Sequence, residues 1–200
     1  MLRETFSLSK IDLLVENPVV AKRQQNKLST TLVALLYIRI TMTNKELIEQ
    51  FYRSFSEGNA EAMGACYHAD VHFTDPAFGD LHGDEARSMW KMLMQRSTEP
   101  AKIQVKNVQA NEETGSADWL ANYKFGPKKR PVENHVSAEF KFVDGKIIRH
   151  KDDFNFWKWS RQATGLPGWL LGWTPIMKKK VQSTVNTALE KFMAADAAQN

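Results

Sequence analysis

The chain has 200 residues, of which 42% are hydrophobic and 25% charged, so it can bury the core of one ordinary domain with extensions. The net charge is only +4, and the basic clusters at 128–130 and 178–180 are not interleaved with aromatic residues, which argues against nucleic acid binding. The five histidines are dispersed, and the single cysteine, Cys66, has no partner for an internal disulfide. The composition therefore predicts no metal site, and it favours a reducing, cytoplasmic compartment.

Residues 1–41 differ from the rest of the chain. They contain an apolar run at 31–40 that is too short to span a bilayer as a helix, and no clear signal-peptide cleavage site follows it. Directly after Met42, Thr43 and Glu46 have the spacing of a capping box, which marks the start of a helix. We therefore expect the working domain to begin at Met42, with residues 1–41 as a disordered leader or a mis-assigned upstream extension.

The next segment predicts helices on both sides of one short strand. Apolar residues recur at helical spacing in three stretches: residues 43–57, 60–67 and 84–95. A strand is predicted at 71–76, between the second and third helices. Its alternation places Asp75 on the same face as Val71 and Phe73, which points the carboxyl group toward the apolar interior.

A turn is expected between Gly79 and Gly83, and a run of strands follows the third helix. The alternating segments are residues 102–109, 119–125, 136–142 and 146–153. The alternation changes phase at Val108 in the first of these strands. Helices followed by strands indicate an α+β fold, in which three N-terminal helices pack on one side of an antiparallel sheet.

The sequence after the last strand predicts a separate extension. We divide the chain into a leader at 1–41, a domain at 42–155 and an aromatic-rich helical extension at 156–195. Within the extension, residues 169–177 have three possible roles: a lid over the domain, a contact between two subunits, or a contact with a membrane surface beside the lysines at 178–180. The modest charge of the final helix favours lid or dimer packing over membrane contact.

An ordered set of short motifs runs through the predicted domain. They are LIEQFYRSF at 47–55 with Gly58-Asn59, YHADV at 67–71, FTDP at 73–76, Gly83, and FVDGKII at 142–148 followed by DDF at 152–154. This order resembles the nuclear transport factor 2-like (NTF2-like) superfamily, and within it the SnoaL-like and ketosteroid isomerase-like branch. The resemblance implies a cone-shaped domain with a curved sheet and a pocket in its concave face. Such a fold hosts isomerases, hydrolases, cyclases, dehydratases and non-catalytic carriers.

The resemblance carries one functional role to Asp75, which corresponds to the general base of ketosteroid isomerases. Burial would raise the pKa of such a carboxyl group and make it a useful base near neutral pH. The alternative is a structural role, because Asp-Pro commonly ends a strand with the carboxylate capping backbone amides. The oxyanion hole of these isomerases is not matched: its tyrosine position falls on Phe51, one residue from Tyr52, and its aspartate position falls near Ala138.

The end of the last strand carries a second candidate. Asp152 or Asp153 resembles the catalytic aspartate of SnoaL-type polyketide cyclases. Alternation places Asp152 on the same face as His150, so the two are expected to form an inward acid–base pair. Arg149 then faces outward, which disfavours the Asp–Arg–Asp arrangement of epoxide hydrolases with this fold. The alternative is a surface charge ladder, with Asp153 capping the helix that follows.

Two functions are compatible with these residues. The first is a cofactor-independent isomerase, cyclase or hydrolase for a small apolar molecule, with Asp75, Asp152 and His150 as catalytic residues. The second is a non-catalytic ligand-binding module or dimeric scaffold, and in both cases we expect a homodimer. The predicted ligand-binding residues, which core packing would also explain, are Phe73, Trp90, Trp119, Tyr123 and Asn134.

Overall fold

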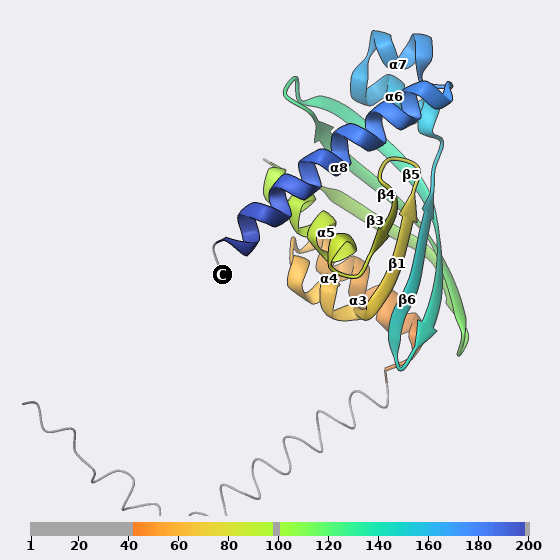
Figure 1. Cartoon of the computed structure of the whole chain (residues 1–200). Helices are drawn as coiled ribbons and strands as arrows, with labels where there is room; N and C mark the ends of the chain where they lie inside the picture. Colours follow the sequence, from red (N-terminus) through yellow and green to blue (C-terminus); the bar gives the residue numbers. More distant parts are fainter. Residues whose placement is uncertain (1–41, 98–100, 199–200) are drawn as a thin grey trace, which may run out of the picture. The chain divides into compact units, whose positions relative to one another are not determined.

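The computed structural model describes residues 42–97 and 101–198 (Figure 1). The predicted leader at 1–41 lies outside the described residues. Residues 43–200 form one compact unit. In the described part of the chain, no helix is long and apolar enough to cross a membrane.

Three helices come first: α3 (Asn44–Ser56), α4 (Ala60–Cys66) and α5 (Asp84–Arg96). The predicted capping box begins α3, because the Glu46 N–H donates to Thr43 Oγ1 at 3.2 Å and the Thr43 N–H donates to Glu46 Oε2 at 2.7 Å. The inward face of α3 buries Leu47, Ile48, Phe51 and Tyr52. The three helices pack on one side of the sheet (Figure 1), which confirms the predicted α+β class.

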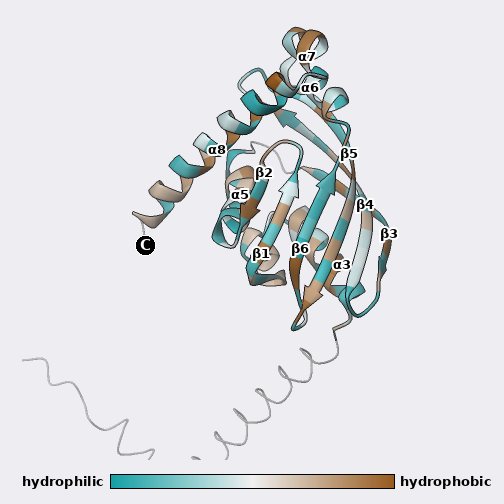
Figure 2. Ribbon diagram, turned by 45° about the vertical axis from the view of Figure 1, so that its right-hand side comes forward, coloured by the Kyte–Doolittle hydropathy of each residue, from teal (hydrophilic) through white to brown (hydrophobic). Residues whose placement is uncertain are grey.

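Six strands form one curved sheet in the order β2-β1-β6-β5-β4-β3 (Figure 2). Their bounds are β1 (Tyr67–Asp75), β2 (Gly79–His82), β3 (Lys102–Ala110), β4 (Thr114–Phe125), β5 (Arg130–Val143) and β6 (Lys146–Asp153). Neighbouring strands are antiparallel except β1 and β6, which are parallel. The phase change predicted at Val108 is a β-bulge, where Asn107 has a φ of 53°.

The segment between Gly79 and Gly83 corrects the sequence prediction, since it holds strand β2 rather than only a turn. Leu81 lies opposite Phe73 in the register, and both side chains are buried. The hairpin therefore adds one more core position beside the strand that ends at Asp75. Its short sequence, Gly-Asp-Leu-His, contains no β-branched residue, which is why it carries no strand signal.

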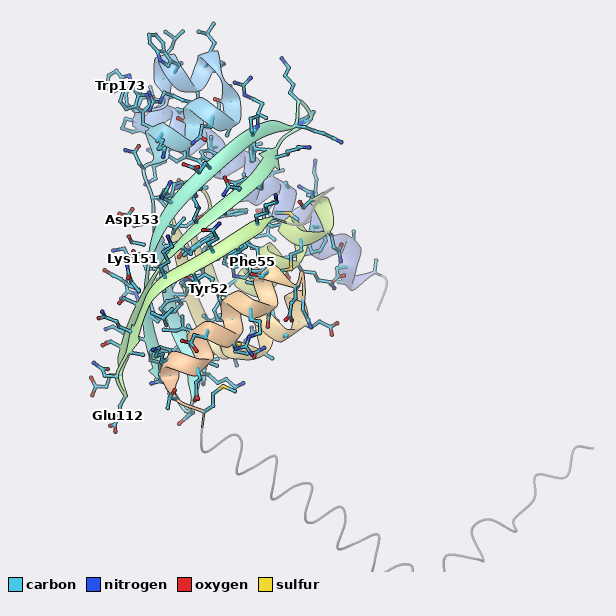
Figure 3. The ribbon with its side chains drawn as sticks, turned by 180° about the vertical axis from the view of Figure 1, so that it is seen from behind. Tyr52, Phe55, Glu112, Lys151, Asp153 and Trp173 are labelled. Atoms are coloured by element: carbon cyan, nitrogen blue, oxygen red, sulfur yellow. The ribbon has the colours of Figure 1, made fainter. Side chains whose placement is uncertain are left out.

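Alternation along the strands separates a core-facing side from an exposed one. In β5 the alternation is unbroken from Val132 to Val143, and the inward positions include Asn134, Val136 and Ala138. Figure 3 shows Lys151 and Asp153 on the outer side of β6, whereas Tyr52 and Phe55 lie between α3 and the sheet. The inner face of the sheet therefore supplies the side chains that any site in the concavity must use.

The C-terminal extension comprises α6 (Phe156–Thr164), α7 (Leu166–Leu171) and α8 (Pro175–Ala197). Helices α6 and α7 approach closely through glycine: a Cβ atom on Gly168 would lie 2.0 Å from the Ser160 carbonyl oxygen. Helix α8 then runs back along α5 (Figure 1), where Lys91 Nζ bonds Asp196 Oδ1 at 2.6 Å. The extension is thus packed against the domain.

Helix α8 is also bonded to the turn between β1 and β2. The Gln182 side chain donates to the Pro76 carbonyl at 3.3 Å, and the Asn186 side chain donates to the Phe78 carbonyl at 2.9 Å. This turn directly follows Asp75. The last helix therefore fixes the backbone beside the candidate base.

Candidate functional site

A cavity of about 1190 Å³ lies between the inner face of the sheet, α5, α6 and α8. Its lining is mainly apolar and includes all five residues predicted to bind a ligand: Phe73, Trp90, Trp119, Tyr123 and Asn134. The lining also includes the exposed residues Asn59 and Leu93, so the cavity reaches the surface. Its size and apolar character suit a small organic ligand.

Asp75 stands at the end of β1 and lines this cavity. Its Oδ1 accepts hydrogen bonds from the N–H groups of Ala77 at 2.9 Å and Phe78 at 2.5 Å. The structural interpretation of the Asp-Pro pair is therefore realised, since the carboxyl group does cap the turn. Both bonds end on one oxygen, which leaves a second oxygen for other partners.

The environment of Asp75 favours its neutral form. Burial, together with the nearby Asp152 carboxylate, raises the pKa of this carboxyl group from 3.8 to about 7, against the lowering effect of the Phe78, Ala77 and Gly79 N–H groups. Desolvation is the largest of these effects, because Asp75 is partly buried in a mainly apolar lining, which disfavours the charged form of its carboxyl group. A carboxyl group with this pKa exchanges protons near neutral pH.

Asp152 lines the same cavity from β6 and is 4% exposed. Its Oδ1 accepts a hydrogen bond from the Trp119 indole N–H at 3.2 Å and lies 3.0 Å from His150 Nε2. The predicted inward pair of His150 and Asp152 is therefore present in the structure. Asp153 and Arg149 are exposed on the opposite face, as the alternation predicts.

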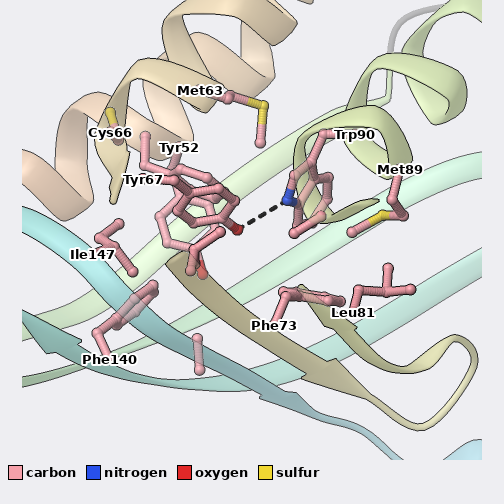
Figure 4. Close-up of a cluster of buried hydrophobic side chains, with 14 of the residues drawn as sticks. Tyr52, Met63, Cys66, Tyr67, Phe73, Leu81, Met89, Trp90, Phe140 and Ile147 are labelled. Atoms are coloured by element: carbon pink, nitrogen blue, oxygen red, sulfur yellow. Dashed lines mark hydrogen bonds between the residues drawn. The ribbon is translucent and has the colours of Figure 1, made fainter. Parts of the chain in front are cut away.

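His150 belongs to a chain of buried hydrogen bonds that ends at the cavity. The Trp90 indole N–H donates to the Tyr67 hydroxyl at 2.9 Å (Figure 4), and that hydroxyl lies 2.7 Å from His150 Nδ1. An indole N–H can only donate, so every proton is used when the Tyr67 O–H donates to Nδ1 and the Nε2–H donates to Asp152. The chain thus fixes both the ring and the Asp152 carboxylate.

The prediction that His150 is a catalytic residue of the cavity needs one correction. Its side chain is fully buried, and it does not line the cavity. Phe140 packs on its ring with centroids 4.4 Å apart, and Phe51 and Phe73 pack edge-on against it. His150 is therefore connected to the cavity by its hydrogen bond to Asp152.

Tyr123 on β4 presents a hydroxyl group to the cavity from the side of α6. The Trp159 indole N–H donates to this hydroxyl oxygen at 2.8 Å. Within the described residues the hydroxyl proton has no acceptor, and burial raises the pKa of Tyr123 to about 12. Tyr123 is therefore a neutral donor whose proton is available to a ligand.

Asn134 on β5 is the second polar group with unused hydrogen bonds. Its residue is 8% exposed and lines the cavity, yet its side-chain amide bonds no other described residue. Its side-chain nitrogen and oxygen keep some accessible surface, so the amide is open to the cavity. A ligand with a polar atom beside Asn134 would satisfy it.

The oxyanion tyrosine of ketosteroid isomerases has no counterpart on α3. Neither Phe51 nor Tyr52 lines the cavity, and both are buried against other aromatic rings. The Tyr52 hydroxyl is buried and makes no hydrogen bond to the described residues.

Cys66 is also unsuited to chemistry, since burial raises the pKa of its thiol to about 11.

The extension takes part in the cavity differently from the sequence prediction. None of the cavity-lining residues comes from 169–177, so this segment does not form a lid. Its tryptophans are exposed instead. The wall is completed by Phe154, Trp159, Thr184, Val185 and Ala188. Periodicity marks α6 and α8 as helices but does not show which of their residues meet the cavity.

No cluster of metal-ligating side chains occurs in the ranges that the structure describes.

Comparison with known proteins agrees with this architecture. A model of the SnoaL-like domain matches residues 48–150. A Catenulispora acidiphila protein with a ketosteroid isomerase-like fold, solved with trimethylamine, is 19% identical at a TM-score of 0.54, covering 66% of this chain and 100% of its own. An NTF2-like protein of unknown function from Burkholderia pseudomallei is 16% identical at a TM-score of 0.52, and the match covers 62% of this chain and 99% of that protein.

An LEH-like epoxide hydrolase of M. tuberculosis is 16% identical at a TM-score of 0.51, covering 62% of this chain and 92% of its own. At these identities the solved structures show a common fold alone. No curated protein sequence matches the chain. The family model spans more than half of the chain, from Ile48 in α3 to His150 in β6. The chain therefore belongs to the SnoaL-like domain family, and it shares the fold of an NTF2-like protein.

Proposed function

We propose that this protein is an enzyme that transfers a proton on a small, mostly apolar substrate bearing a carbonyl or epoxide oxygen. The observation that carries the proposal is the convergence of polar groups in one apolar cavity. Asp75 and Asp152 bring two carboxyl groups, and Tyr123 and Asn134 bring hydrogen-bond donors without protein acceptors. Such groups at the wall of an accessible cavity are the usual sign of an active site.

Asp75 is the general base in this proposal. With a pKa of about 7, a substantial fraction of the carboxyl group is ionised at neutral pH and can accept a proton. The proton comes from a carbon next to the carbonyl in an isomerase or cyclase, or from the attacking water in a hydrolase. The Asp75 backbone position is held by the turn that it caps and by α8.

Tyr123 is the donor to the substrate oxygen. As the base removes a proton, negative charge develops on that oxygen, and an O–H group aimed at it stabilises the transition state. The Trp159 N–H already occupies one lone pair of the hydroxyl oxygen, which directs the proton away from α6. Tyr123 thereby takes the role of the oxyanion-hole tyrosine, which α3 does not supply. Asp152 is the second proton-transfer group, and its carboxylate is oriented by His150 and Trp119.

Replacing Tyr123 with phenylalanine should lower kcat by about 10²–10³-fold, the usual effect of removing an oxyanion donor, with a smaller change in KM. Trp159→Phe should lower kcat less, because it removes only the hydrogen bond that orients the Tyr123 hydroxyl. Tyr52→Phe is the control, since that hydroxyl is buried away from the cavity. Steady-state kinetics of the three variants measure the differences. An unchanged kcat for Tyr123→Phe would remove Tyr123 from the chemistry.

A binding module is the second candidate function. It is favoured by the structural role that Asp75 already has in capping the turn, and by a lining that is mainly apolar. A ligand bound to such a module raises the melting temperature as its concentration rises above Kd, without forming product. The two candidates therefore differ in product formation alone.

The proposal is tested by incubating the full-length protein with small probes of each substrate class. Suitable probes are 3-cyclohexen-1-one, whose double bond migrates into conjugation, and styrene oxide, which opens with water. Product is followed by chromatography, and binding by the melting temperature. We expect turnover of at least one probe that is lost in Asp75→Asn and retained in Asp70→Asn, because the Asp70 side chain is 88% exposed. Stabilisation by the probes without any product would favour the binding module.

A further inference from the structure

Helix α7 and the start of α8 carry a cluster of large apolar side chains on the surface. This α7 patch consists of Leu166, Trp169, Leu170, Leu171, Trp173 and Ile176, each more than half exposed and Ile176 as much as 79%. Figure 2 shows the apolar colour on α7, and Figure 3 shows Trp173 at the end of the unit opposite Glu112. Contiguous apolar surface of this kind usually marks an interaction site.

The exposed position of the patch follows from how α7 packs. The side of α7 that meets α6 is made of glycine: Gly168 is buried, and Cβ atoms on Gly168 and Gly172 would each lie 2.0 Å from atoms of Ser160. The large side chains therefore point away from the domain. An ordinary surface helix buries its apolar residues and exposes the small or polar ones, so the pattern on α7 is reversed.

The charges of the segment that carries the patch have one sign, although Lys158 pairs with Glu133 of β5 at 3.7 Å. Between Asp153 and Glu190 the sequence contains no acidic residue and five basic ones: Lys158, Arg161, Lys178, Lys179 and Lys180. The three consecutive lysines are exposed and begin two residues after Ile176. Arg161 stacks over the half-exposed Trp157 ring at 4.5 Å from its centroid. An apolar surface bordered by cations is complementary to a surface that is apolar inside and anionic outside.

We propose that the α7 patch docks on the surface of an anionic lipid membrane. Trp169 and Trp173 lie in the interfacial layer, where the amphipathic indole ring is most stable, and the leucines reach the acyl chains. Lys178, Lys179 and Lys180 contact the lipid headgroups. The contact is peripheral and does not require a spanning helix.

A second copy of the chain fits this surface less well than a membrane does. A two-fold symmetric contact places the same patch on both sides of the interface. The lysine clusters that border it would then face each other across the contact, and like charges at close range destabilise an interface. Anionic headgroups provide the opposite charge.

The experiment is co-sedimentation of the full-length protein with vesicles of phosphatidylcholine alone, or with a quarter of the lipid replaced by phosphatidylserine. We expect binding to the anionic vesicles that weakens as salt is added. Trp169→Gln with Trp173→Gln should reduce the partition coefficient at least about tenfold. Lys179→Glu with Lys180→Glu should reduce it at least about 20-fold, since each lysine near the surface contributes about fivefold.

Two matched controls should bind like the unmodified protein. Val143→Gln changes an exposed apolar residue on β5, and Lys141→Glu with Arg149→Glu reverses two exposed charges paired across β5 and β6. All variants keep residues 1–41, so binding through that segment would persist in the patch variants and overturn the proposal. Absence of vesicle binding would also overturn it, as would a dimer in light scattering that the tryptophan variant converts to a monomer.

Discussion

Asp75→Asn should lower the turnover of the cavity's substrate by about 10²–10⁴-fold, the usual contribution of a general base. The amide keeps an oxygen at Oδ1, so it can still accept the hydrogen bonds from Ala77 and Phe78 that hold the turn. It cannot accept a proton at neutral pH. The loss should therefore appear in kcat while the fold is kept. Asp70→Asn on the same strand is the matched control, because its side chain is exposed.

The same substitution should change how stability depends on pH. The Asp75 pKa is about 7 in the folded protein against 3.8 for an unburied group, so the folded state binds more protons between these values. The stabilising contribution is complete below about pH 4 and is lost as the pH rises through 7. At pH 8 the asparagine variant should be more stable by up to about 4 kcal/mol, and near pH 4 the difference should vanish. Chemical denaturation of both proteins at pH 4 and pH 8 measures the difference in their free energies of unfolding. An equal difference at the two pH values would show that Asp75 is not desolvated.

His150→Leu should destabilise the protein by about 2–6 kcal/mol. The substitution leaves two buried groups, the Asp152 carboxylate and the Tyr67 hydroxyl, without their shared partner, and each unsatisfied group costs about 1–3 kcal/mol. Leucine fits among the surrounding aromatic rings, so loss of packing contributes less than loss of hydrogen bonds. Urea denaturation of the purified variant measures the free energy of unfolding.

A conservative variant separates the two hydrogen bonds. His150→Gln can retain a donor toward Asp152 while losing the acceptor for Tyr67, so it should fall between the wild type and His150→Leu. Arg149→Leu is the control, since that neighbouring side chain is exposed on the outer face of β6. A His150→Leu protein as stable as the Arg149→Leu protein would show that the buried chain of hydrogen bonds does not support the fold.

Much of the site could be predicted because strands alternate. A period of two fixes which side chains of β1, β4, β5 and β6 face inward, and this places Asp75, Asn134 and Asp152 on the inner face without any knowledge of the fold. The same rule places Arg149 and Asp153 outside, as the structure shows. The helix that begins after Thr43 is equally well marked, because its capping box is a local interaction.

The contacts that the sequence could not predict join residues far apart in the chain. Tyr67 meets His150 because β1 pairs in parallel with β6, and no local pattern specifies that pairing. Trp159 reaches Tyr123 because α6 packs on the end of β5. The sequence shows aromatic residues after β6 but not whether they fill the cavity, line it or face solvent. Those outcomes depend on tertiary packing.

The pKa of the Asp75 carboxyl group decides whether this residue can be the base of the cavity. It is measured by carbon NMR of the full-length protein with isotope-labelled aspartate, titrated between pH 3 and pH 9. Asp75→Asn identifies the resonance, and no substrate is needed. A titration midpoint near 7, as burial in the apolar cavity requires, is the expected result. A midpoint near 3.8 would show a solvated carboxylate that only caps the turn, and it would contradict the assignment of Asp75 as the base.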